Sequence, residues 1–232
     1  ILVVWEGGLF GLVRWGVTMR GGPGHVDFSA EMERTLQVLD YAILVINGAD
    51  GVQGHTMTLW RLLARYQIPT FLFINKMDQD GTDKEKLLVE LKKRLSDNCV
   101  DFTWEKSALH SQFLEDVSVC DEELLEKYLE TEKISTSDIQ KVIKERKLFP
   151  CFFGSALKMT GVEEFLHGLE KYCETPTYPS EFGAKVFKIA RDDQGNRLSY
   201  MKITGGTLKV KELLTDTEKA DQIRIYSGAK FE

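Results

Sequence analysis

The 232-residue sequence lacks closely spaced cysteines and has no excess of basic residues. Its four cysteines (Cys99, Cys120, Cys151 and Cys173) show no CxxC or other tight metal-ligand spacing. Such spacing is typical of reduced thiols rather than of a disulfide framework or a cysteine-based metal site. The net charge of −6 disfavours general nucleic-acid binding, because neutralising phosphates requires basic residues. We expect no direct, sequence-specific contact with nucleic acid.

The sequence also lacks an uninterrupted apolar run long enough to cross a membrane. The most apolar stretch, residues 1–17, contains Glu6 and Arg14 and is broken by four glycines. This pattern favours two short strands, 1–5 and 9–15, over a signal or membrane segment. We expect a cytoplasmic protein with no membrane association. Because the stretch has no initiating Met, we also expect it to begin inside a longer protein.

What the sequence does contain is a regular alternation of helical and strand-like segments. Hydrophobic residues make up 43% and charged residues 28%, so a packed core is expected. Alternation of this kind predicts βαβ units and a parallel sheet. The predicted elements are a helix at 30–39, a strand at 41–46, a helix at 56–66, a strand at 70–74, a strand at 148–153 and a helix at 162–172.

Two further regions complete the predicted organisation. Residues 80–147 are polar and highly charged, which indicates helices with a solvated face. After a proline-containing linker at 175–179, the pattern changes to strands without helices. These strands are predicted at 184–190, 198–204 and 207–213, with a turn at 192–196. We therefore predict one α/β domain over residues 1–178 and the start of an antiparallel domain over residues 179–232.

Asn75-Lys76-Met77-Asp78 directly follows the predicted strand 70–74. Ligands of open α/β sheets bind beyond the carboxyl ends of the strands. The Asp78 carboxylate can accept hydrogen bonds from guanine N1–H and the N2 amine together, and adenine lacks this donor pair. Asn75 can bridge the base and neighbouring loops, and the Lys76 stem can lie along the purine and ribose. The alternative is an ordinary polar turn after a strand.

Gly154-Ser155-Ala156-Leu157-Lys158 follows the predicted strand 148–153 in the same way. The backbone N–H of Ala156 can donate to guanine O6, and small residues permit close approach of a ligand. Gly-Ser-Ala is common in loops, so this motif is informative mainly because it follows the first one in order.

Pro23-Gly24-His25 precedes the predicted helix 30–39. A glycine N–H ahead of a helix can bond a terminal phosphate, using the exposed donors of the helix start. His25 could orient an attacking water, since phosphoryl transfer depends on positioning and electrostatic stabilisation. A lone histidine is more often structural.

Several longer segments of the sequence resemble a known protein family. The segments PGHVDFSAEMERTLQVLDYAILVINGADGVQGHT and IPTFLFINKMD closely resemble the GTPase domain of elongation factor G and its relatives. The short insertion between the two base motifs, with DEELLEKYLE and KLFPCFFGSAL, is similar to that of the ribosomal protection proteins of tetracycline resistance. FGAKVFKIARDDQGNRLSYMKITGGTLKVKELL resembles the opening of their second, β-barrel domain. The resemblance covers residues 23–232 and is most specific over 23–80.

The resemblance implies a P-loop-type GTPase fold, with a parallel sheet and helices on both faces. This domain is incomplete at its N-terminus and is followed by part of an antiparallel β-barrel domain. The implied ligand is GTP or GDP, with Mg²⁺ in the intact protein, and the implied partner is the ribosome. His25 would position the hydrolytic water. The implied nucleotide-binding residues are Pro23, Gly24, His25, Asn75, Lys76, Asp78, Ser155, Ala156 and Leu157.

The sequence also departs from the family pattern. The family carries Asp-x-Pro-Gly-His, in which the Asp holds Mg²⁺ through water, and Gly21 stands at that position here. The phosphate-cradling G-x-x-x-x-G-K-S/T motif is missing, because Gly16 and Gly21 have the glycine spacing but Gly22-Pro23 follow. No metal-binding Thr is identifiable before Pro23. We therefore assign no metal ligand.

These observations leave two hypotheses for the function. In the first, the chain is a piece of a GTP-hydrolysing factor acting on the ribosome, either a tetracycline-resistance ribosomal protection protein or a translocation factor like elongation factor G. In the second, it is a guanine-binding or structural module without hydrolysis. The parent protein is expected to follow the first hypothesis, and the isolated chain the second.

Overall fold

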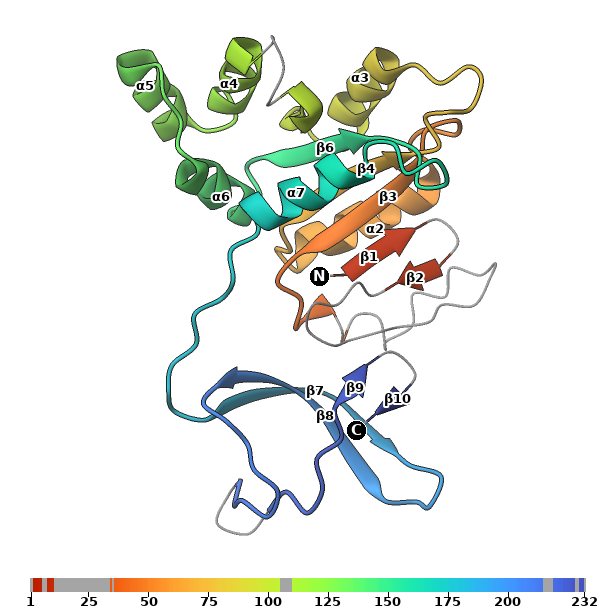
Figure 1. The fold of residues 1–232 in the computed structure, drawn as a ribbon, viewed down its shortest axis with the longest axis vertical. Helices are drawn as coiled ribbons and strands as arrows, with labels where there is room; N and C mark the ends of the chain where they lie inside the picture. The colour runs from red at the N-terminus through yellow and green to blue at the C-terminus, as the bar shows by residue number, and fades with distance from the viewer. Residues whose placement is uncertain are drawn as a thin grey trace.

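The computed structural model describes residues 2–5, 8–10, 34, 36–104, 110–214, 219–227 and 230–231. Figure 1 shows the arrangement of these parts. Pro23, Gly24 and His25 lie outside the described residues, as do residues 11–15 of the second predicted strand and half of the predicted helix 30–39 (residues 30–33 and 35).

A six-stranded sheet forms the centre of the larger part of the molecule (Figure 1). Its strand order is β2-β1-β3-β4-β6-β5, and every neighbouring pair is parallel except β1 with β2. This arrangement confirms the predicted parallel sheet. The strands are β1 (Leu2–Trp5), β2 (Gly8–Phe10), β3 (Ala42–Asn47), β4 (Thr70–Asn75), β5 (Cys99–Asp101) and β6 (Phe149–Phe153).

Helices cover both faces of this sheet, as the fold class predicts. Alternate side chains of a strand point to opposite faces, so Leu44 and Ile43 of β3 enter two different cores. Leu63 and Leu91 pack in the core with Leu44, and Tyr172 packs in the core with Ile43. The helices are α2 (Gly54–Arg65), α3 (Lys84–Arg94), α4 (His110–Ser118), α5 (Glu122–Thr131), α6 (Thr136–Lys144) and α7 (Val162–Tyr172).

The charged region 80–147 forms helices, with one correction. Exposed ion pairs such as Lys141–Glu123 (2.9 Å) lie on their outer surface, and Leu124 and Ile143 are buried beneath. Its helical content is therefore confirmed. The region also contains the buried strand β5 and a short 3₁₀ helix, Phe102–Trp104, which sequence periodicity did not predict. A strand of three residues is too short to give a period-two signal.

The C-terminal region contains an antiparallel hairpin of β7 (Gly183–Arg191) and β8 (Arg197–Gly205), as predicted. Its turn is held by Asp192, whose Oδ1 accepts from Gln194 N (3.1 Å) and Asn196 N (2.8 Å). Two short strands, β9 (Tyr226–Ser227) and β10 (Lys230–Phe231), pair with each other.

The predicted strand at 207–213 is wrong. Glu212 N donates to Lys209 O (3.1 Å), and Lys211 adopts a left-handed φ of 67°. These features form a turn, which prevents the alternating side chains from pairing along a strand. Leu213 makes a single isolated bridge with Lys219.

Candidate guanine-nucleotide site

The two predicted base-binding loops lie side by side at the carboxyl edge of the sheet. They follow β4 and β6, which are parallel neighbours with Ile74 opposite Phe153. Gly154 N donates to Ile74 O (2.9 Å), and Met77 N donates to Gly154 O (3.0 Å). The strand pairing therefore continues into the loops and fixes their separation.

Asn75 joins these loops through one side-chain oxygen. Its Oδ1 accepts from Lys76 N and from Ala156 N, both at 2.8 Å, across 81 residues of sequence in the second case. Lys76 has a left-handed φ of 63°, which turns the chain sharply after β4. In this structure the Ala156 N–H, which we predicted to donate to guanine O6, is therefore already donating to Asn75. A contact with O6 requires this hydrogen bond to be shared or exchanged.

Asp78 lies against the second loop. Lys158 Nζ is 3.4 Å from its Oδ2, and 23% of the Asp78 side chain remains exposed. A hydrogen bond from the buried Ser155 hydroxyl, with a smaller contribution from Lys158, holds the pKa of Asp78 below its ordinary value. The carboxylate is therefore ionised at neutral pH and can accept two hydrogen bonds from a ligand.

Two glycines allow the second loop to close on itself. A side chain at Gly154 would collide with Thr160 O, and one at Gly161, which has a φ of 71°, would collide with Phe153 O. Ser155 N donates to Thr160 O (2.9 Å), and Thr160 N donates back to Ser155 O (3.1 Å). The closed loop buries Ser155 and leaves Leu157 at its rim, 92% exposed.

The structure thus brings together four of the predicted residues: Asn75, Asp78, Ser155 and Ala156. Lys76 and Leu157 flank them on the same two loops. The predicted phosphate-side residues Pro23, Gly24 and His25 lie outside the described residues.

Sequence reasoning missed a cavity of about 450 Å³ that borders Asp78 on the side of β5. Lys84 lines it, and its Nζ lies 2.5 Å from Oδ2 of the buried Asp101 and donates to Thr103 Oγ1 (2.6 Å). Asp101 is the last residue of β5 and Thr103 comes two residues later, at the sheet edge where the two base motifs follow β4 and β6. The sequence signal for this cavity is the polar pair Asp101 and Thr103 at the carboxyl end of a third parallel strand. Because β5 has only three residues, sequence periodicity does not reveal it.

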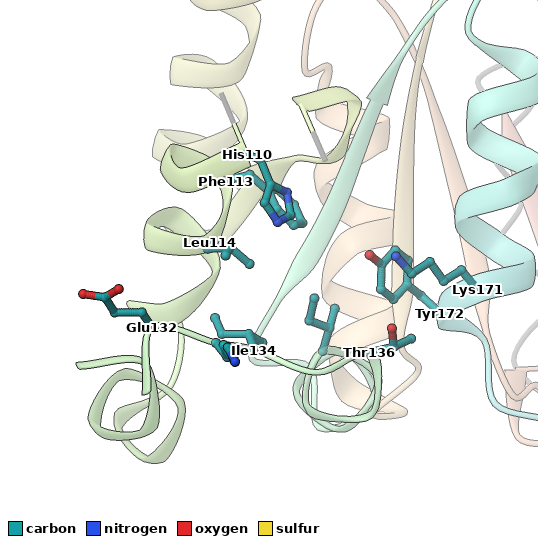
Figure 2. A pocket seen from close by; sticks show the side chains of 10 residues that line it. His110, Phe113, Leu114, Glu132, Ile134, Thr136, Lys171 and Tyr172 are labelled. Carbon is teal, nitrogen blue, oxygen red and sulfur yellow. The ribbon is translucent and has the colours of Figure 1, made fainter. Parts of the chain in front are cut away.

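A second cavity, of about 340 Å³, lies at the other end of α7 (Figure 2). It is lined by residues of α4, α6 and the connection before α6, together with Lys171 and Tyr172 at the end of α7. The 11-residue helix α7 begins beside the Gly154–Lys158 loop, so about 16 Å of helix separates this cavity from the candidate base site. It is not part of the nucleotide site.

The described residues contain neither a cluster of typical metal ligands nor a membrane-spanning helix. No group of three or more His, Cys, Asp or Glu side chains gathers there in a way that could hold a metal ion. None of the helices described is both long and apolar enough to span a bilayer.

Comparison with known proteins identifies the family. The elongation factor Tu GTP-binding domain model matches residues 21–175. Elongation factor G of Ureaplasma urealyticum is 30% identical over 274 aligned positions, covering 90% of this chain and 40% of that protein. The tetracycline resistance protein TetO of Streptococcus mutans is 33% identical over 219 positions, covering 88% of this chain and 34% of TetO. The chain thus spans about two fifths or less of the length of these relatives.

A solved structure shows the same fold. A crystal structure of a protein from Thermus thermophilus superposes with a TM-score of 0.68 at 23% identity, over 89% of this chain and 38% of that one. The parallel sheet, the paired loops at its carboxyl edge and the family match agree with each other. The chain therefore belongs to the elongation factor Tu GTP-binding domain family and is of the elongation factor G type among translational GTPases.

Proposed function

We propose that the chain is the guanine-reading part of a cytoplasmic, ribosome-associated GTPase that acts in translation. The observation that carries this proposal is the hydrogen bond that Ala156 N–H donates to Asn75 Oδ1, which joins the loop that carries Asp78 to the loop after β6. Guanine would be selected there, since an ionised carboxylate accepts from N1–H and the N2 amine together.

Each remaining loop residue has a defined part in this proposal. The Ser155 hydroxyl orients the Asp78 carboxylate, and the Ala156 N–H supplies the donor for guanine O6 when it is shared with Asn75. The Lys76 stem and the exposed Leu157 side chain offer apolar surfaces for the two faces of a planar base.

The phosphate side of the proposal rests on the family pattern. Gly24, with Pro23, would contact the terminal phosphate, and His25 would position the attacking water when the factor is on the ribosome. GTP hydrolysis is therefore proposed for the intact protein. Mg²⁺ would neutralise phosphate charge in such a protein. Gly21 has no side chain to hold it, and no three His, Cys, Asp or Glu side chains among the described residues gather as a metal site.

Within this class we propose a ribosomal protection protein of tetracycline resistance. The alignment with elongation factor G is 274 positions long and includes 90% of this chain. The alignment with TetO is only 219 positions long and includes nearly as much of it, 88%. The first alignment therefore contains many more gap positions. A compact insertion between the two base motifs, here the segment from α3 to α6, supports the assignment to the ribosomal protection proteins.

The test of this proposal uses the complete reading frame that contains the chain. Expressed in a tetracycline-sensitive bacterial strain, it should raise the minimum inhibitory concentration of tetracycline, and the Asp78→Asn variant should not. If resistance is unchanged but the purified protein promotes translocation of tRNA on ribosomes, the elongation factor G alternative is correct. Failure in both assays contradicts both assignments.

A second candidate function is a guanine-binding or structural module without hydrolysis. The absence of G-x-x-x-x-G-K-S/T from the sequence favours it for the 232-residue chain itself. Turnover of GTP by the purified chain with Mg²⁺ and ribosomes distinguishes the two, since only a hydrolytic factor releases phosphate.

A further inference from the structure

Two lysines of the β7–β8 hairpin reach the segment at residues 37–40, which directly precedes β3. Lys202 Nζ lies 2.7 Å from both carboxylate oxygens of Asp40 and donates to Val38 O at 2.9 Å. Lys185 Nζ donates to Gln37 O at 2.8 Å. Lys185 and Lys202 are directly opposite each other in the hairpin, so the two ammonium groups act from one place on its surface.

The Lys202 contacts use the full capacity of its ammonium group. An ammonium has three donors, and three acceptor atoms lie within 2.9 Å of it. The Lys202 side chain is only 25% exposed, and that of Asp40 is 39% exposed. Partial burial and two shared oxygens make this pair stronger than a typical exposed ion pair, which is worth little.

The backbone explains why cations are favoured at this place. Arg34 and Leu36 have helical backbone, and Leu39 N donates to Leu36 O (3.3 Å) as the helical segment ends. The last carbonyls of a helix have no partner within the helix and carry a partial negative charge. Gln37 O and Val38 O lie in the turn that directly follows Leu36, and the two lysines donate to them at this helix end, where cations are favoured.

We propose that Lys185 and Lys202 form an electrostatic clasp that docks the β7–β8 hairpin on residues 37–40. The clasp ties the hairpin to the end of the segment that begins with Pro23, Gly24 and His25 in the sequence. This interface depends on charge and hydrogen bonds between the two parts of the chain. The partner surface that the hairpin recognises is a helix end followed by a carboxylate.

The test compares Lys202→Met with Lys188→Met in the 232-residue chain. Lys188 lies on the same hairpin, but its ammonium faces the ring of Tyr200 within the hairpin (5.4 Å), so it is the matched control. Amide hydrogen exchange at residues 37–42 and protease cleavage within residues 174–182 report on the docked state. Lys202→Met should accelerate both several-fold, Lys185→Met less, and Lys188→Met not at all.

Two further measurements keep the test decisive. Lys202→Arg retains the charge and should restore most of the protection, whereas a purely space-filling role would favour the methionine. Raising the salt concentration to about 1 M should accelerate exchange at residues 37–42 in the wild-type chain, because salt screens partly exposed charges. Equal exchange in Lys202→Met and Lys188→Met, or wild-type exchange that is insensitive to salt, would overturn the clasp.

Discussion

At the scale of single residues, Asp78 shows how the candidate site combines selectivity with solvent access. Its carboxylate is partly exposed, yet it contacts Ser155 and Lys158 on the loop after the neighbouring strand. Lys158 is 61% exposed and 3.4 Å away, so its ion pair contributes little by itself. The Ser155 hydroxyl is buried, and it therefore determines where the carboxylate points.

The first prediction concerns base selection by Asp78. Asp78→Asn replaces two good acceptors by one acceptor and one donor, so guanine affinity should fall roughly tenfold or more. Binding of xanthine nucleotides should improve relative to guanine, because the C2 oxygen of xanthine can accept from the new amide. Calorimetric titration of the proposed intact GTPase with GDP and xanthosine diphosphate measures both. Asp80→Asn, an exposed residue two positions later, is the control, and unchanged GDP affinity in Asp78→Asn would refute the assignment.

The second prediction concerns pH. The Ser155 hydrogen bond lowers the pKa of Asp78, so the ionised form is the one favoured in the folded state. The stability that this hydrogen bond contributes is therefore present above pH 3.8, the ordinary pKa of an aspartate. It is lost as the pH falls through the lowered pKa of Asp78. Ser155→Ala should raise the pKa of Asp78 and move the acid loss of guanine binding to higher pH.

Carboxyl NMR titration checks this shift. Asp83 provides an internal reference, because its pKa is lowered by hydrogen bonds with Lys86 and does not depend on Ser155. If neither the pKa of Asp78 nor that of Asp83 changes in the Ser155→Ala variant, Ser155 does not orient the Asp78 carboxylate.

At the scale of elements, the strands that carry the site could be predicted from the sequence almost residue by residue. Strands 70–74 and 148–153 are recognisable because they are continuous, buried apolar runs, and the structure places them at Thr70–Asn75 and Phe149–Phe153. β5 could not be predicted, since its three residues give no periodic signal. The turn at Lys209–Glu212 overrode an alternating pattern that otherwise favours a strand.

The third prediction concerns the packing of α7, the helix that follows the second base loop. A Cβ added at Gly168 would collide with the ring of Phe152, whereas one at Gly54, in α2, would meet nothing within 4 Å. Gly168→Ala should therefore lower the free energy of unfolding by about 1–3 kcal/mol through overpacking. Gly54→Ala should leave it unchanged or raise it by up to about 1 kcal/mol, because alanine is the better helix former. Urea denaturation of both variants tests this, and equal midpoints would show that the Phe152 ring moves aside without cost.

At the scale of the whole molecule, the pairing of the two base loops followed from a topological rule. Motifs at the carboxyl ends of parallel strands meet at one edge when their strands are neighbours, and β4 and β6 are neighbours. The Asn75–Ala156 hydrogen bond could not be predicted, because it depends on loop geometry set by Gly154, Gly161 and the left-handed Lys76. The contact of Lys202 with Asp40 spans 162 residues, and no local pattern signals it.

The last prediction concerns nucleotide binding by the 232-residue chain as a whole. GTP carries several negative charges, which the family neutralises with a P-loop lysine, backbone N–H groups and Mg²⁺. The sequence has the base motifs but lacks the G-K-S/T ending of the phosphate loop, and Gly21 replaces the metal-ordering Asp. Base and ribose contacts alone correspond to affinity of roughly millimolar order.

We therefore expect the isolated chain to bind guanine nucleotides weakly or not at all, GTP and GDP about equally, with negligible hydrolysis. His25→Ala should change nothing in this chain, although in the intact parent protein it should abolish turnover stimulated by ribosomes. Calorimetry with GTP, GDP and guanosine, each with and without Mg²⁺, measures the affinities. Micromolar, Mg²⁺-dependent binding with a clear preference for GTP would contradict the expectation, because it would require a phosphate site built from residues that carry none of the known motif.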